Sequence, residues 1–135
     1  MELSGKILPG LTGTAEIIVG TRDTAPHVGS GKIGVLATPI MVNLMEAAAL
    51  QAVERFMPSG HQTVGTHLDV KHFAATPVGL RVVAHAELVK VEGRTLTFRI
   101  RAEDEREPIG EGFHERLIIN VERFDVRMQK KLGNA

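Results

Sequence analysis

Three residues of this chain, Thr38, Glu46 and His72, carry an alcohol, a carboxylate and an imidazole where the surrounding pattern expects apolar side chains. Such groups can serve as a nucleophile and as general acids or bases. Glu46 is the most informative, because it lies within the stretch from Leu44 to Leu50, which is apolar on nearly every side. A carboxylate in such surroundings must be paired, hydrogen-bonded or shifted in pKa. The trio therefore indicates a functional site.

The direction of His72 follows from strand periodicity. Side chains of a strand alternate between two faces, so the segment from Gln62 to Ala74 divides into two sets. One face carries Val64, Leu68, Val70 and His72, and the other carries His67, Asp69 and Lys71. A lone histidine on an apolar face is more often a satisfied core residue than a catalytic one. Because Glu46 also occupies an apolar face, we interpret His72 as a candidate site residue.

Thr38 precedes a proline, which is typical of a helix start with Thr38 as N-cap and Pro39 at the first helical position. A cap and a catalytic hydroxyl are compatible, because a helix N-terminus favours a developing oxyanion. In one straight helix Thr38 and Glu46 would lie about 12 Å apart along the axis, too far for contact. Either Thr38 lies in the loop before the helix and folds back, or the site is completed across a dimer interface.

The elements that must position these residues follow from the hydrophobic period. Helical spacing of apolar residues predicts one long helix from Thr38 to about Phe56. Thr24 to Gly34, rich in glycine, predicts a loop, and a short basic tail begins at Arg127. Alternating patterns predict strands at Gly13 to Val19, Gln62 to Ala74, Leu80 to Val91, Thr95 to Ala102 and Ile109 to Phe124.

This order of elements, one strand, a long helix and four strands joined by short connections, predicts an antiparallel sheet of about five strands. A single apolar helix requires a concave sheet to wrap it. The order is that of an α+β hotdog fold with one central helix. At 135 residues the chain is expected to form one domain over 1–135. One side of that domain stays open, so we expect at least a dimer.

Composition excludes several classes of function. The chain has 16 basic and 16 acidic residues, so we expect neither nucleic acid nor a membrane as partner. It has no cysteine, which excludes thiolate nucleophiles and zinc-thiolate sites and fits a reducing cytoplasm. The polar start from Met1 to Lys6 and the absence of a long apolar run predict no signal segment and no membrane span. His67 and Asp69 are too few ligands for a metal site, so no metal and no cofactor are expected.

Three segments of the chain resemble the fluoroacetyl-CoA thioesterase-like family of hotdog proteins: Ala37 to Glu46, Gly65 to Gly79, and Gly112 to Arg116. They occur in order and with matching spacing, and the resemblance runs from about Thr38 to Phe124. It implies that Thr38, Glu46 and His72 form the catalytic set for acyl-CoA hydrolysis. It also implies that Gly65 lies near the thioester carbonyl and Arg116 near the acyl pocket. Without the resemblance, Gly65 reads as a strand bulge and Arg116 as a solvated strand charge.

The leading hypothesis is a cofactor-free acyl-CoA thioesterase, a homodimer or dimer of dimers, that hydrolyses a small or short-chain acyl-CoA to free acid and CoA. His72 is the expected general base, supported by Glu46, and Thr38 is the nucleophile or positions the attacking water; alternatively, Glu46 is itself the base or nucleophile. Two other functions remain open, a hotdog hydratase or dehydratase and a non-catalytic acyl-thioester binding protein.

Two further features concern the substrate. The segment from Gly29 to Leu36 is glycine-rich and has no aromatic residue, unlike the longer aromatic lid of the fluoroacetyl-specific branch, so selectivity for fluorine is not predicted. CoA carries phosphates, which guanidinium and ammonium groups bind. The candidate contacts are Lys71, Lys90, Arg94, Arg127, Lys130 and Lys131.

Overall fold

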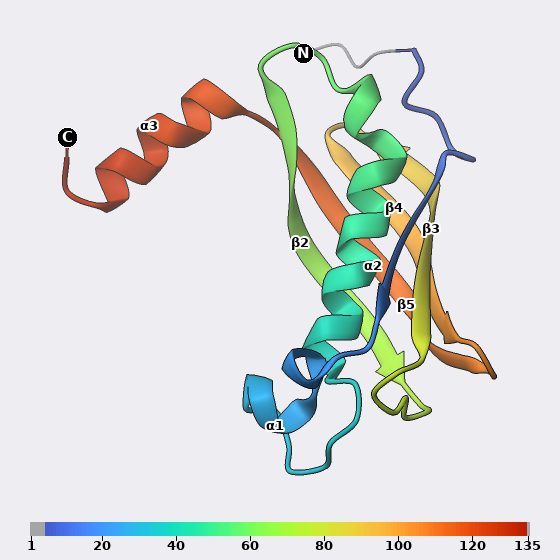
Figure 1. Ribbon diagram of the computed structural model, residues 1–135. Helices are drawn as coiled ribbons and strands as arrows, with labels where there is room; N and C mark the ends of the chain where they lie inside the picture. Colours follow the sequence, from blue (N-terminus) through green and yellow to red (C-terminus); the bar gives the residue numbers. More distant parts are fainter. Residues whose placement is uncertain (1–4, 135) are drawn as a thin grey trace.

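The structure is a computed structural model that describes residues 5–134 (Figure 1). Residues 1–4, which belong to the N-terminal stretch for which we predict no signal segment, and residue 135 lie outside the described part. The helices are α1 (Ala25–Val28), α2 (Thr38–Val53) and α3 (Val121–Lys131), with 3₁₀ turns at Thr21–Asp23 and Glu54–Phe56. The strands are β1 (Thr12–Ile18), β2 (His61–His72), β3 (Arg81–Glu92), β4 (Thr95–Asp104) and β5 (Pro108–Asn120). No helix within residues 5–134 is long and apolar enough to cross a membrane.

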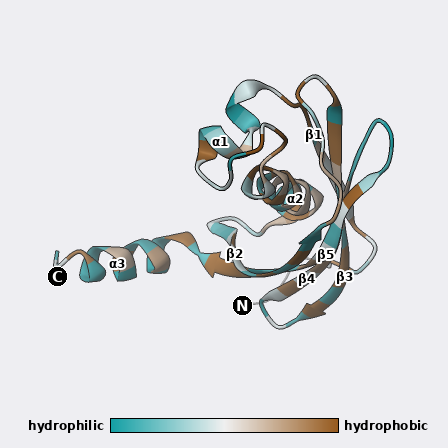
Figure 2. Ribbon diagram, turned by 90° about the horizontal axis from the view of Figure 1, so that it is seen from below, coloured by the Kyte–Doolittle hydropathy of each residue, from teal (hydrophilic) through white to brown (hydrophobic). Residues whose placement is uncertain are grey.

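The five strands form one antiparallel sheet in the order β1-β3-β4-β5-β2. Short hairpins join β3 to β4 and β4 to β5. The prediction that short connections join all four later strands as neighbours is wrong for β2, which pairs with β5 at one edge of the sheet and not with β3. Viewed nearly end-on, α2 lies in the curve of the sheet, with β1 and β2 on either side of it (Figure 2). The prediction of one long helix wrapped by an antiparallel sheet is confirmed.

The core lies between α2 and the concave face of the sheet. Met41, Met45 and Ala48 of α2 are fully buried, one or two turns apart on the same face of the helix. In β3 and β4 every second residue points at the helix, so burial alternates along both strands. The buried side chains of these strands are Val82, Ala84, Ala86, Leu88, Leu96, Phe98, Ile100 and Ala102.

Two predicted segments differ from the structure. The expected loop from Thr24 to Gly34 contains the one-turn helix α1, which has Pro26 in its first turn and ends at Gly29, where φ is +85°. The last strand ends at Asn120 rather than Phe124, and α3 replaces both its predicted end and the basic tail. The cause is the Asn120 side chain, which accepts a hydrogen bond from the Arg123 backbone N–H at 3.0 Å and caps the helix.

The predicted alternation along β2 is interrupted by a bulge. Gly65 pairs with Arg116 and His67 with Glu115, so Thr66 is the additional residue. The side chain of His72 faces the helix side together with Val70, as predicted. The assignment of Val64 to that same face is wrong, because the extra residue reverses the alternation between the two parts of the strand.

The packing of β1 against α2 depends on a glycine. A methyl group on Gly13 would lie 2.2 Å from the Ala48 carbonyl oxygen and 2.6 Å from the Ala52 backbone nitrogen. Gly13→Ala must therefore push the strand away from the helix, and we expect a loss of about 1–3 kcal/mol in the free energy of unfolding. Chemical denaturation measures it. Gly34→Ala is the control, because a methyl group on Gly34 would have nothing within 4 Å; equal stability of the two variants contradicts the prediction.

Candidate functional site

Thr38 is the first residue of α2, but its side chain does not cap the helix. The N-cap position belongs to Ala37, and the α2 N-cap makes no side-chain hydrogen bond. The predicted roles of Thr38 as N-cap and Pro39 as first helical residue are therefore wrong by one position. The Thr38 hydroxyl instead forms a hydrogen bond of 2.7 Å between its Oγ1 and Nδ1 of His72, which is the last residue of β2. The fold thus brings together two residues that are 34 positions apart.

The environment of His72 favours its neutral form. Burial lowers the pKa of His72, and the backbone of Ala74 opposes this effect. A neutral imidazole makes this hydrogen bond in one of two tautomers, with Nδ1 either accepting from the Thr38 hydroxyl or donating to it. Nε2 is buried and has no hydrogen-bond partner among residues 5–134. With Nδ1 unprotonated, the imidazole is placed to accept the hydroxyl proton.

A hollow of about 340 Å³ adjoins this pair. Thr38 and His72 line it together with residues of the loop before α2. The remaining lining residues are Ala25, Ser30, Gly31, Lys32, Ile33, Val35, Leu36, Phe73, Ala74 and Ala75. The lining includes no carboxylate and combines polar with apolar groups. The volume suits a small group beside the hydroxyl and the imidazole.

Glu46 belongs to a second cluster, built around Arg116. The Arg116 side chain is 8% exposed, so the interpretation of a solvated strand charge is wrong. Its Nε donates to Thr63 Oγ1 at 2.9 Å, its Nη2 to the Thr63 carbonyl at 3.2 Å, and its Nη1 to His114 Nε2 at 3.2 Å. The Oε2 atom of Glu46 lies 3.7 Å from Nη1. Hydrogen bonds and an ion pair thus compensate the burial of this guanidinium.

His114 is a member of this cluster that the sequence interpretation missed. It is completely buried, and its Nδ1 donates to the His67 carbonyl at 2.8 Å, which leaves Nε2 to accept from Arg116. Burial lowers the pKa of His114 and keeps it neutral. The signal was present in the period of two of β5, which places His114, Arg116 and Ile118 on one face of the strand.

Gly65 provides the space in which this cluster meets the helix. A methyl group on Gly65 would lie 2.8 Å from Glu46 Oε2 and 3.2 Å from His114 Cε1. The residue also begins the β2 bulge, so the bulge interpretation of this glycine is correct. A side chain at this position would displace the carboxylate of Glu46. Gly65 therefore lets the carboxylate and the buried histidine approach the strand backbone.

Within one chain the structure does not join the two clusters. Thr38 contacts His72, whereas Glu46 contacts Arg116 and not His72. The eight-residue step from Thr38 to Glu46 spans about 12 Å of helix, as the sequence predicts. The Glu46 side chain is 37% exposed, more than its apolar helix suggests. One edge of its carboxylate therefore faces the open side of the domain.

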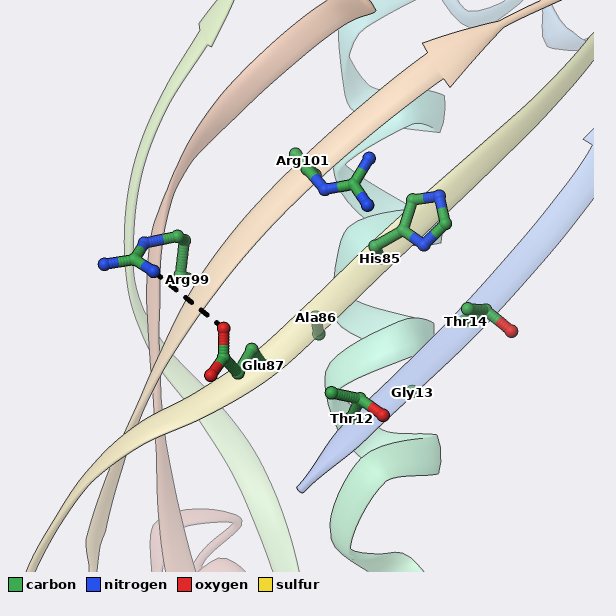
Figure 3. A pocket seen from close by; sticks show the side chains of 8 residues that line it. All are labelled: Thr12, Gly13, Thr14, His85, Ala86, Glu87, Arg99 and Arg101. Atoms are coloured by element: carbon green, nitrogen blue, oxygen red, sulfur yellow. Dashed lines mark ion pairs between the residues drawn. The ribbon is translucent and has the colours of Figure 1, made fainter. Parts of the chain in front are cut away.

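The convex face of the sheet carries a different kind of hollow, of about 290 Å³ (Figure 3). Its ionisable side chains already have partners: Arg99 Nη1 lies 3.8 Å from Glu87 Oε1, and His85 Nε2 lies 2.6 Å from Glu103 Oε1. His85 is thus a sheet-surface residue, as expected. Residues 5–134 contain no group of three or more His, Cys, Asp or Glu side chains arranged to hold a metal ion.

Comparison with known proteins identifies the family. The family model of fluoroacetyl-CoA-specific thioesterases matches residues 19–122. The fluoroacetyl-CoA thioesterase of Streptantibioticus cattleyicolor is 44% identical over 97 residues, which are 72% of this chain and 70% of that protein. The chain belongs to the fluoroacetyl-CoA thioesterase family. The predicted family and the predicted class of enzyme, a thioester hydrolase, are confirmed.

Solved structures agree with this assignment and confirm the hotdog thioesterase fold. The fluoroacetyl-CoA thioesterase FlK superposes with a TM-score of 0.87 at 37% identity, over 93% of this chain and 97% of that chain. A variant of FlK in complex with acetyl-CoA gives a TM-score of 0.85 at 36% identity, over 93% and 98% of the two chains. A hypothetical protein of the thioesterase superfamily from Thermus thermophilus gives 0.87 at 26% identity, over 97% and 99%.

The buried state of His114 makes stability depend on pH. Its pKa is below that of an unfolded histidine, about 6.5, so below that pH the unfolded chain binds more protons than the folded chain. The free energy of unfolding must therefore fall as the pH drops from about 7 to about 5. In His114→Gln this loss of unfolding free energy should be smaller. It should not vanish, because the pKa of His72 is also lowered. Denaturation at several pH values measures it, with the loop variant His61→Gln as control. An unchanged slope in His114→Gln contradicts the neutral, buried assignment.

Proposed function

We propose that this chain hydrolyses a small or short-chain acyl-CoA thioester to the free acid and CoA, as a cofactor-free enzyme. The observation that carries the proposal is the hydrogen bond between the Thr38 hydroxyl and a neutral His72 beside a hollow of about 340 Å³. The family membership supports the reaction, and the acetyl-CoA complex of a FlK variant supports a small acyl group. The glycine-rich loop before α2 gives no reason to expect selectivity for fluorine.

The geometry supports general base catalysis by His72. Nδ1 of His72 removes the proton of the Thr38 hydroxyl, or of a water held by it, as the oxygen attacks the thioester carbonyl carbon. The carbonyl oxygen becomes an oxyanion that backbone N–H groups at the start of α2 stabilise, together with those near Gly65 of the partner subunit, which lies beside Glu46. The carbon–sulfur bond then breaks, and the leaving thiolate takes the proton from His72. If Thr38 is acylated, water completes the hydrolysis through the same base.

Glu46 is proposed to act on the His72 of a second copy. A carboxylate beside the imidazole would hold the ring in place and stabilise its charged form. Glu46 of the same chain is about 12 Å of helix away from Thr38. We therefore propose that the partner subunit's Glu46, and not Glu46 of the same chain, lies beside His72. The alternative, in which Glu46 is itself the base or nucleophile, also requires a shared site.

An exposed strand edge supports the homodimer. Among the described residues, β2 pairs only with β5, so a twelve-residue edge presents free backbone N–H and C=O groups. Leu68 and Phe73, on and beside this strand, are 42% and 53% exposed. Antiparallel pairing of two β2 edges is an isologous contact that buries this edge in both copies. A dimer of dimers adds a further interface and leaves this one unchanged.

The catalytic roles predict large losses of activity. His72→Ala removes the base and Glu46→Ala its carboxylate support, so turnover of acetyl-CoA should fall by about 10²- to 10⁴-fold. Release of CoA, measured with a thiol reagent, reports the rate, and His61→Ala is the control. Full activity in both folded variants would contradict the proposed catalytic roles. A hydratase or dehydratase should not need Thr38 and would hydrate an enoyl-CoA without releasing CoA. Release of CoA by wild type and its loss in Thr38→Val therefore separate the two enzyme classes.

Subunit complementation tests the shared site. Thr38→Ala and Glu46→Ala are each expected to be inactive, but a heterodimer of the two has one site with intact Thr38, His72 and Glu46. Unfolding and refolding an equimolar mixture should restore about a quarter of wild-type activity, because half of the dimers are heterodimers with one intact site each. Each variant refolded alone is the control. No recovery, with heterodimers detected by mass spectrometry, contradicts a site completed by the partner.

A further inference from the structure

Three arginines line one hollow at the end of the sheet that is remote from His72. The hollow has a volume of about 380 Å³ and lies where β5 passes into α3, beside the turn between β3 and β4. Arg94 comes from that turn, and Arg123 and Arg127 come from α3. The other lining residues are Leu117, Ile118, Ile119, Asn120 and Phe124. The lining therefore combines three cations with no carboxylate.

Backbone and capping contacts hold the three arginines near one another. The Ile118 N–H donates to the Arg94 carbonyl at 2.9 Å, which fixes the turn beside the last residues of β5. Gly93 allows the tight turn, with φ at +62°. On the other side the Asn120 cap fixes the first turn of α3 and thus the position of Arg123. Arg127 follows Arg123 by four residues, so both side chains lie on the same face of α3.

Within residues 5–134 these cations have no carboxylate partner. None of the ion pairs formed within residues 5–134 includes Arg94, Arg123 or Arg127. The neighbouring Glu92 is paired with Lys90 at 3.0 Å. Glu122 lines an adjoining hollow that Arg123 and Arg127 also line, but it forms no ion pair with either of them. Lys130 and Lys131 extend the basic face of α3, seven and eight residues after Arg123. Although the whole chain has zero net charge, this local excess of positive charge attracts anionic ligands.

We propose that Arg94, Arg123 and Arg127 form a binding site for the phosphate groups of a small phosphorylated molecule. Guanidinium groups present planar, charged donors that match phosphate oxygens, and several of them can surround a diphosphate. Phe124 and Leu117 provide an apolar wall for the organic part of the ligand. The site itself does not depend on the catalytic residues. Only the assignment of the phosphates to the CoA of a substrate rests on the proposed function.

The position of the hollow constrains where such a substrate reacts. Asn120 at the hollow pairs with His61 at the start of β2, whereas His72 is the last residue of that strand, about 36 Å away. The arginines are thus remote from Thr38 and His72 of their own chain. If two copies pair antiparallel along β2, this end of one copy lies beside the opposite end of the other. A CoA nucleotide at these arginines would then serve the thioester site of the partner.

Direct binding tests the site without relying on catalysis. The probe is 3′-phosphoadenosine 5′-diphosphate, titrated by calorimetry into wild type, Arg94→Gln and the double variant Arg123→Gln/Arg127→Gln. We expect the single variant to weaken binding about tenfold, the double variant to weaken it further, and added salt to weaken binding to wild type. Arg101→Gln is the control, because Arg101 is an exposed cation on the convex face, paired with Glu103. Absence of binding to wild type, or equal affinity in all variants, overturns the proposal.

A kinetic comparison then identifies the source of the phosphate. If CoA is the ligand, the same variants raise KM for acetyl-CoA about tenfold without changing kcat, and leave acetyl-pantetheine, which lacks the nucleotide phosphates, unaffected. If they weaken binding of the nucleotide but leave both sets of kinetic constants unchanged, the site holds a separate phosphorylated molecule. Both results support the anion site. If the chain hydrolyses no thioester at all, the calorimetric result still decides the proposal.

Discussion

The burial of α2 in the curve of the sheet is the interaction on which the rest of the molecule depends. Met41, Met45 and Ala48 fix the rotation of the helix, because turning it would expose side chains that each stabilise the fold by about 1–3 kcal/mol when buried. With the rotation fixed, the start of α2 meets the end of β2, and Thr38 reaches His72. The same rotation turns Glu46 toward Arg116 and the open side of the domain.

A second set of contacts holds the segments that flank the Thr38–His72 pair. The Thr76 hydroxyl donates to Asp104 at 2.8 Å, and the Thr76 carbonyl accepts from the Leu36 N–H at 2.8 Å. The chain after β2 and the chain before α2 are thereby joined to each other and to the end of β4. Thr76 is completely buried, so these bonds are shielded from water. This support keeps a threonine in an exposed helix turn within hydrogen-bond distance of a histidine on another element.

Much of the fold was predictable from the sequence because its elements have clear periods. The hydrophobic periods predict the long helix and the strands with bounds close to those observed. Helix geometry also predicts correctly that Thr38 and Glu46 are not in contact within one chain. The errors arose where a single side chain or backbone contact decides the structure. The Asn120 cap converts an apparent strand end into α3, and the bulge at Gly65 moves Val64 to the other face of β2. Pattern alone does not reveal such local contacts.

The site was predictable in part, for a related reason. Residue type and parity indicated an inward His72, but the partner of each polar group depends on tertiary packing. The sequence suggested Glu46 as the companion of His72, whereas in one chain His72 bonds to Thr38 and Glu46 pairs with Arg116. His114 shares one face of β5 with Arg116, but the sequence does not show that its ring accepts a hydrogen bond from that guanidinium.

The proposed catalysis requires a neutral His72 whose unprotonated Nδ1 accepts a hydrogen bond from the Thr38 hydroxyl. Nitrogen-15 NMR of the imidazole measures this most directly, because protonated and unprotonated ring nitrogens differ strongly in chemical shift. At pH 7 we predict an unprotonated Nδ1 and a proton on Nε2, with the Nδ1 signal shifting in Thr38→Val. A proton on Nδ1, or a doubly protonated ring at that pH, would contradict the claim.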